Sequence, residues 1–245
     1  MSNRSGASYF FEGFSLIKTK GLKRFVFVPL FINLLLFSVA FYFLWSQLEL
    51  AINYLINFIP DFLGWLKTAL NYLLWPIAVI TVLLIFGLIF GTLANWIAAP
   101  FNGLLSEKVE RYLTGQDMGN ESLLSAVKDV PRTLGREFSK VFYFIPRAAG
   151  FLILFFLLPV IGQILWFLFT AWMMAIQYCD YPFDNHKVAF KQMRHRLNQQ
   201  KGKCFSFGII VNVFSLIPIV NFLVMPVAIC GATSLWVDEF TEKIL

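Results

Sequence analysis

Residues 25–45 read FVFVPLFINLLLFSVAFYFLW and residues 76–100 read PIAVITVLLIFGLIFGTLANWIAAP, and neither run contains a charged side chain. An uncharged apolar run of about 20 residues is long enough to cross the roughly 30 Å hydrocarbon core of a bilayer as a helix. The composition agrees, since 58% of the 245 residues are hydrophobic, 14% are charged and the mean hydropathy is +0.70. Soluble domains carry about 25% charged residues. The sequence therefore predicts an all-α integral membrane protein with two long transmembrane helices, at about 25–45 and 76–100.

The placement of the basic residues predicts how these spans are oriented. The formal net charge is +6, and lysine and arginine gather in 4–24, 108–147 and 187–203 and at Lys243, with Lys67 elsewhere. Basic segments beside spans stay on the cytoplasmic side. Both termini are therefore expected inside, and 48–75 outside, either as an interfacial helix or as extensions of the two spans. Basic residues placed beside apolar runs indicate a lipid bilayer as partner and argue against nucleic acid.

Two later apolar stretches, 148–179 and 205–237, are each interrupted by a proline. The interruptions read LLPVIG at 157–162 and LIPIVN at 216–221. If each stretch crossed once, the basic residues of 187–203 would lie outside. The arms before the prolines are roughly 16 to 20 Å long, too short to cross. We therefore expect two partially penetrating helical hairpins from the cytoplasmic side, in one membrane domain whose residues 102–145 form polar cytoplasmic helices. Paired interrupted segments are typical of transporter binding regions.

The sequence contains few residue patterns that indicate catalysis. The common nucleophile, zinc-protease, dinucleotide and phosphate-loop signatures are absent, and the three cysteines show neither a disulfide framework nor a zinc spacing. Cys179, Asp180, Asp184 and His186 could ligate a metal, but an ordinary turn beside the membrane explains them better. We expect no enzyme activity, no metal and no cofactor.

One short segment has the chemistry of an anion site. Residues 20–25 read KGLKRF, immediately before the first span. In Gly21, Leu22, Lys23 and Arg24, the glycine allows close approach of the backbone, and free helix N–H groups and two cationic side chains can face a compact dianion such as sulfate. The alternative is an orientation signal that contacts acidic lipid headgroups, and these residues alone favour it.

Charged residues near the membrane form a second candidate. Glu107 and Arg111 are four residues apart and can pair on one helical face. Arg147 follows Pro146 and opens the first expected hairpin. Ionisable groups at membrane depth usually face a cavity or a pathway. For Glu107 and Arg111 a solvated helix pair is an equal alternative.

Small residues at Gly87, Gly91, Ala94 and Ala98 form a stripe along one helical face. Such a stripe permits close helix packing. The packing can lie within the chain or between subunits, and the second case would give a homo-oligomer.

Four strings of residues carry a resemblance to a known family. They are GLKRF at 21–25, NWIAAPFNGLL at 95–105, QYCDYPFDNHK at 177–187 and PVAICGAT at 226–233. The chain resembles the CysZ sulfate permease family over nearly its whole length. The resemblance implies a helical protein of the bacterial inner membrane that takes up sulfate, linked to protons, for cysteine biosynthesis. It also implies sulfate binding at the motif that contains Gly21, Leu22, Lys23 and Arg24.

Two other functions are compatible with these residues. A channel or carrier for thiosulfate, selenate or molybdate needs the same charges and donors, so its flux would differ only in selectivity. A membrane scaffold would give no flux.

Overall fold

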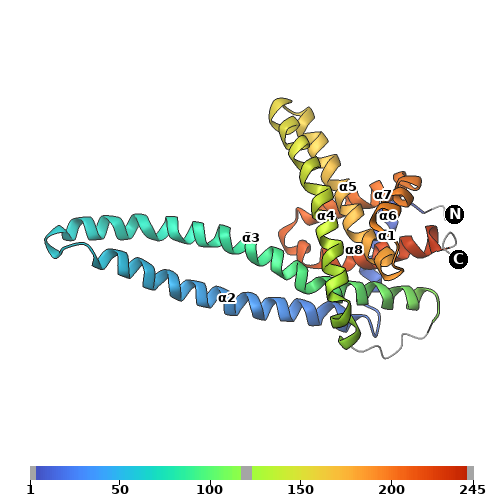
Figure 1. Ribbon diagram of the computed structural model, residues 1–245, viewed down its shortest axis with the longest axis horizontal. Helices are drawn as coiled ribbons and strands as arrows, with labels where there is room; N and C mark the ends of the chain where they lie inside the picture. Colours follow the sequence, from blue (N-terminus) through green and yellow to red (C-terminus); the bar gives the residue numbers. More distant parts are fainter. Residues whose placement is uncertain (1–3, 117–122, 242–245) are drawn as a thin grey trace. The chain divides into compact units, whose positions relative to one another are not determined.

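The computed structural model describes residues 4–116 and 123–241, apart from the side chains of short helical stretches, chiefly 88–100 and 123–130. Every regular element in these ranges is helical, which confirms the predicted all-α class. The elements are α1 (Gly6–Leu16), α2 (Lys23–Asn57), the 3₁₀ helix η1 (Asp61–Leu63), α3 (Gly64–Leu113), α4 (Leu123–Leu157), α5 (Ile161–Asn185), α6 (Phe190–Gln199), α7 (Lys201–Ser215) and α8 (Pro218–Glu239) (Figure 1). They form two compact units, Val28–Ile97 on the one hand and Met1–Phe27 with Ala98–Leu245 on the other.

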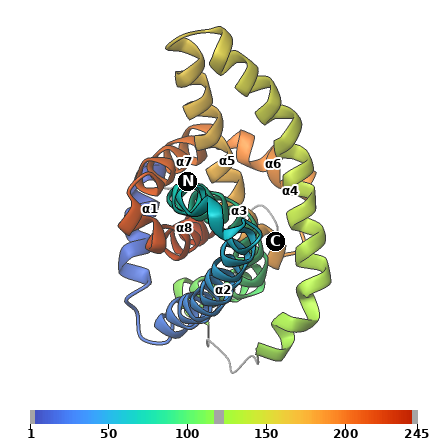
Figure 2. The same ribbon diagram turned by 90° about the vertical axis from the view of Figure 1, so that its left-hand side faces the viewer.

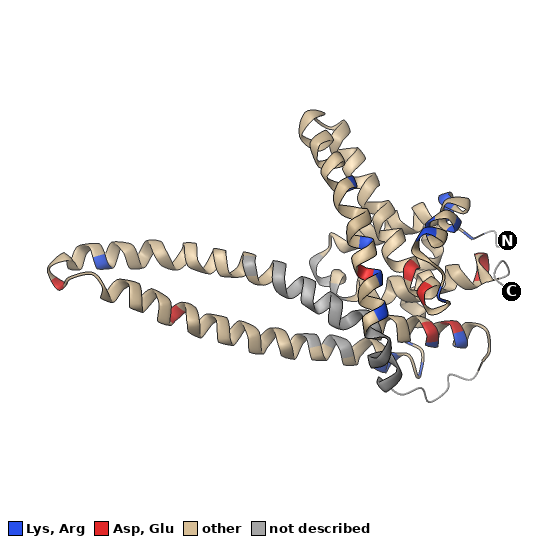
Figure 3. Ribbon diagram, viewed as in Figure 1, with Lys and Arg blue, Asp and Glu red and all other residues tan. Residues whose placement is uncertain are grey.

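The unit Val28–Ile97 is a long pair of antiparallel helices, α2 and α3, joined through η1 (Figure 1). Aromatic rings connect the two helices, with centroids 4.9 Å apart for Phe37 and Phe86 and 5.8 Å apart for Trp45 and Trp75. Charged residues are sparse along this pair (Figure 3). Residues 48–75 extend both helices rather than forming a separate interfacial helix, which selects one of the two predicted options.

Four helical segments in the described ranges are long and apolar enough to cross a membrane. They are Leu34–Asn57, Asp61–Leu84, Pro131–Leu157 and Ile161–Asn185. At most 28% of the apolar window in any of them is buried inside the protein, so the exposed apolar side chains are left to face lipid. This is a multi-pass membrane protein. The first two segments lie nearer the η1 turn than the predicted 25–45 and 76–100, because α2 and α3, at 35 and 50 residues, exceed the length that a bilayer requires.

The first interrupted stretch turns where its proline predicts. α4 ends at Leu157 and α5 begins at Ile161, so the two helices meet at this turn (Figure 2). They are also in contact with each other. The predicted arm is wrong in length, however, because α4 continues unbroken through Pro131 and Pro146. Residues 102–145 are accordingly the end of α3 and the polar half of α4, not separate helices. Each proline removes one backbone donor, but α4 is held to α5 by ion pairs described below.

The second stretch also turns at its proline. α7 ends at Ser215 and α8 begins with Pro218 at its first position, where a missing N–H costs nothing because that group has no helical partner. α7 has 15 residues and is about 22 Å long, still shorter than a bilayer core. The α4 segment Pro131–Leu157 is long enough to cross a bilayer. Partial penetration of both hairpins therefore stays a prediction.

The core of the larger unit lies among α1, α5, α7 and α8 (Figure 2). α1 and α8 approach closely through glycines on both helices. A Cβ at Gly13 would lie 2.1 Å from the carbonyl oxygen of Val227, and one at Gly231 would lie 2.4 Å from that of Tyr9. The same crossing carries polar contacts, because Tyr9 Oη donates to Asp238 at 3.0 Å and Ser234 Oγ donates to Glu12 at 2.7 Å. The N-terminal helix is thus fixed on the last helix of the chain.

Candidate functional site

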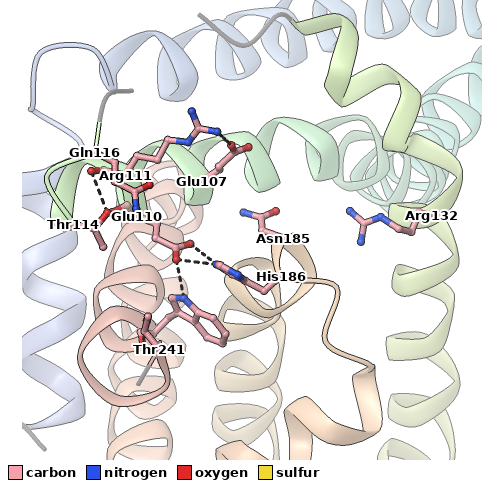
Figure 4. A pocket seen from close by; sticks show the side chains of 10 residues that line it. Glu107, Glu110, Arg111, Thr114, Gln116, Arg132, Asn185, His186 and Thr241 are labelled. Carbon is pink, nitrogen blue, oxygen red and sulfur yellow. Dashed lines mark hydrogen bonds and ion pairs between the residues drawn. The ribbon is translucent and has the colours of Figure 1, made fainter. Parts of the chain in front are cut away.

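A polar cavity of about 450 Å³ opens where the end of α3 meets α4, the end of α5 and α8. Its lining consists mainly of charged and amide side chains: Glu107, Glu110, Arg111, Thr114, Gln116, Arg132, Asn185, His186, Trp236 and Thr241 (Figure 4). All ten belong to the larger compact unit. A cavity lined by ionisable groups is unusual in a chain with 14% charged residues, and such groups in membrane proteins commonly mark ion pathways.

The predicted pair of Glu107 and Arg111 is present on one wall of this cavity. Arg111 Nη2 donates to Glu107 Oε1 at 2.6 Å, and both side chains are partly buried. The spacing of four residues places the two groups on adjacent turns of α3. Both residues belong to the cavity lining, and the charge of the guanidinium is balanced by the carboxylate.

Glu110, one turn of α3 beyond Glu107, connects α3 with the end of α5 and with α8. Its carboxylate accepts hydrogen bonds from His186 Nε2 at 2.8 and 3.0 Å and from Trp236 Nε1 at 3.1 Å (Figure 4). The imidazole also stacks on the Trp236 indole, with ring centroids 4.9 Å apart. The hydrogen bond to Glu110 raises the pKa of His186 above its ordinary value, against the opposing effect of burial. The carboxylate therefore favours the protonated form of the imidazole.

Arg132 contributes the second guanidinium, from α4. It forms an ion pair with the Asp184 carboxylate and donates to the Asp184 carbonyl oxygen at 3.1 Å. Asn185, the next residue, donates to the Gly103 carbonyl oxygen at 2.9 Å. These contacts hold the end of α5 between α3 and α4, so the cavity wall is fixed from both sides.

A buried ion cluster holds α4 to α5 farther along the same helices. Arg136 binds Asp180 through Nη2 at 2.7 Å and Nε at 2.9 Å. Lys140 Nζ lies 3.4 Å from Asp180 and 2.6 Å from Glu137. Such a two-pronged arginine contact fixes geometry as well as charge. The residues considered for a metal thus have other partners, and in the described part of the chain no three His, Cys, Asp or Glu side chains are grouped to hold a metal ion.

Gly21, Leu22, Lys23 and Arg24 form the turn between α1 and the start of α2 and do not line this cavity. Gly21 has a φ of 96°, which favours glycine, and Leu22 is fully buried. Lys23 and Arg24 are exposed in the first turn of α2, and the Arg24 guanidinium lies 4.8 Å from the Phe25 ring centroid. The exposed cations and the helix start are present at this turn, whereas the Leu22 N–H donates to the Thr19 carbonyl oxygen at 3.2 Å. Anion binding here stays a prediction.

Arg147 is also separate from the cavity that Glu107 and Arg111 line. It lies on a second cavity, bounded by α4, α5, α6 and α7. The structure thus brings two of the three predicted pathway charges together and places the third elsewhere.

Sequence reasoning missed His186, Asn185 and Trp236 as cavity residues. The first two fall in the string 177–187, which contributed to the resemblance, and His186 was otherwise considered only as a metal ligand. Trp236 lies at the end of the apolar stretch 205–237, where a tryptophan gives no signal for a polar site.

One comparison with known proteins bears on the chain. The family model described as "Sulfate transporter CysZ/Etoposide-induced protein 2.4" matches residues 9–226. The matched range begins in α1 and ends within α8, so it contains the charged cavity apart from Trp236 and Thr241.

Proposed function

This chain belongs to the family of the sulfate transporter CysZ and the etoposide-induced protein 2.4, and from that membership we propose that it is a permease that takes up sulfate. The membrane is the bacterial inner membrane, with both termini in the cytoplasm. The sulfate supplies assimilation and cysteine biosynthesis. The protein acts as a homo-oligomer and needs no cofactor.

The charged cavity is the observation that carries this proposal. Arg111 and Arg132 each present a planar guanidinium, which matches two oxygens of a tetrahedral oxyanion. Each is held by a carboxylate, Glu107 or Asp184. A sulfate in the cavity therefore competes with these carboxylates, so binding is reversible and the ion can leave.

Proton linkage has a physical basis in the same cavity. A sulfate ion adds two negative charges beside Glu107 and Glu110. Protonation of the His186 and Glu110 pair offsets part of that charge, since an added positive charge favours the anion. The raised pKa of His186 supports this role.

The turn of Gly21, Leu22, Lys23 and Arg24 is proposed as a sulfate-binding site on the cytoplasmic side. The helix N–H groups of Lys23 and Arg24 and their exposed side chains provide donors and positive charge together. The positive φ of Gly21 lets the backbone turn toward the ion.

The direct test is uptake of labelled sulfate into liposomes that contain only the purified chain. We expect saturable uptake, reduced at least about tenfold by Arg111→Gln, because a charge-assisted contact in the cavity is lost. Lys67→Gln is the matched control, since Lys67 pairs with the fully exposed Asp61 at the η1 turn. It should transport like the parent.

The same assay separates the alternatives. Faster uptake of thiosulfate, selenate or molybdate than of sulfate would indicate a permease for another oxyanion. No uptake of any of these ions by well-folded protein would indicate a scaffold and overturn the proposal.

A further inference from the structure

The second cavity, of about 750 Å³, differs in character from the first. Its walls are aromatic and aliphatic, with Phe151 on α4, Trp172 on α5 and Phe205 on α7 among them. Its polar members gather at the ends of α6 and α7 and at Arg147 on α4. No carboxylate is among the described residues that line it.

Basic groups converge on this polar rim. The Arg147 guanidinium lies 3.6 Å from the Tyr143 ring centroid, and that of Arg194 lies 4.2 Å from the same ring. Lys201 opens α7 beside them. In sequence, residues 185–237 contain six lysines and arginines and no aspartate or glutamate. With Arg147 and Lys201 on the cavity and Arg194 beside it, the rim is positively charged and favours an anionic group.

The rim also lies at a suitable depth. From Arg147 to its end at Leu157, before the hairpin turn, α4 rises about 15 Å. Half of a bilayer core is about 15 Å thick. With the turn at the bilayer centre, Arg147 reaches the cytoplasmic headgroups and the apolar walls face the acyl chains.

We infer that this cavity binds an anionic phospholipid, with the headgroup phosphate at Arg147 and Lys201 and an acyl chain along the apolar walls. Basic pockets between helices on the cytoplasmic side recognise such headgroups. The start of α7 adds backbone donors, because a Cβ at Gly202 would meet nothing within 4 Å and the peptide is open to approach. A zwitterionic lipid fits the walls, but its cationic headgroup adds a positive charge beside the basic rim.

Two other occupants fit less well. A free sulfate or phosphate ion would satisfy the rim and leave the apolar walls in contact with water. A second copy of this chain would have to present carboxylates at the rim. The inference depends on the membrane location and on the predicted partial penetration of the α4–α5 hairpin, so it stands or falls separately from sulfate transport.

The test is native mass spectrometry of the detergent-purified full chain with palmitoyl-oleoyl phosphatidylglycerol or the matching phosphatidylcholine. We expect at least about tenfold stronger retention of phosphatidylglycerol, lost in Arg147→Gln/Lys201→Gln. Lys187→Gln/Lys191→Gln removes the same charge from exposed positions off the cavity and should retain the preference. Leu168→Trp, which fills the cavity, should weaken both lipids.

Four results would overturn the inference. The first is equal retention of the two lipids, and the second is unchanged retention in the Arg147 and Lys201 variant with its thermal stability intact. The third is displacement of the lipid by inorganic phosphate at the same concentration, which would leave an anion site alone. The fourth is contact between copies of the chain. A lipid-free dimer dissociated by Leu168→Trp would assign the cavity to contact between copies. Lipid retention also tests Arg147 in a way that transport alone cannot, because a pathway charge would alter flux and leave lipid binding unchanged.

Discussion

Arg24 offers the sharpest residue-scale test of the proposed turn site. Its side chain is exposed at the start of α2, so Arg24→Ala should leave the fold intact and remove a charge-assisted contact worth about 1.5 to 3 kcal/mol, or roughly tenfold or more in sulfate affinity. Arg24→Lys should recover only part, because an ammonium lacks the two-pronged geometry. Calorimetry on the purified variants measures both. Unchanged affinity in Arg24→Ala would make this arginine an orientation signal.

His186 predicts a pH-dependent contribution to stability. Its side chain is 40% exposed and pairs with Glu110, with Glu107 and Arg111 facing the same cavity. The folded-state pKa is raised, so the pair stabilises the fold fully below the unfolded pKa of about 6.5 and loses this as pH rises through the folded value. His186→Gln should therefore cost roughly 0.2–1 kcal/mol at pH 5.5 and nothing at high pH. If thermal unfolding shows that His186→Gln loses the same stability at every pH from 5.5 to 9, this prediction is wrong.

At the scale of the elements, the crossing of α1 and α8 depends on glycine. Gly13→Ala places a methyl group against the Val227 backbone, and overpacking of this kind costs about 1–3 kcal/mol. Gly150→Ala is the matched control, because a Cβ at Gly150 of α4 meets nothing within 4 Å and alanine favours a helix by about 1 kcal/mol. When thermal unfolding is measured in detergent, only Gly13→Ala should have a lower midpoint than the parent. Equal midpoints would show that the helices separate without cost.

The hairpins predict a one-sided accessibility. Asn198 and Gln199, exposed at the end of α6 between the two hairpins, should react as cysteine variants only with a cytoplasmic thiol reagent. The physical reason is that each hairpin returns to the side from which it enters. Labelling of both positions solely from outside would replace the hairpins by simple spans.

The sequence separation between interacting residues explains which of these elements could be predicted. Pro159 and Pro218 marked the two turns because proline acts on its own backbone, and the Glu107 and Arg111 pair follows from a spacing of four. The continuation of α4 was missed because Arg132 and Arg136 bind Asp184 and Asp180, 52 and 44 residues away. Glu110 meets His186 and Trp236 across 76 and 126 residues. No local pattern contains such pairs.

At the scale of the whole molecule, proton linkage predicts that a pH gradient drives uptake. Liposomes with an acidic exterior should take up sulfate faster than liposomes without a gradient, because His186 and Glu110 load a proton on the acidic side. His186→Gln should reduce this acceleration, while Lys67→Gln should preserve it. Equal rates with and without the gradient in the parent would remove proton linkage and leave passive sulfate flux.

The packing of α1 against α8 also determines when the chain can complete its fold during synthesis. Arg4 and Asp238 are in contact across 234 residues, so the first helix leaves the ribosome long before its partner exists. At 5–20 residues per second, that delay is roughly 10 s or more. During this time the apolar face of α1, with Tyr9 and Phe10 fully buried in the finished protein, has no final packing partner. Assembly of the larger unit therefore ends only after α8 has been synthesised, and membrane insertion of the intervening helices precedes closure of the core.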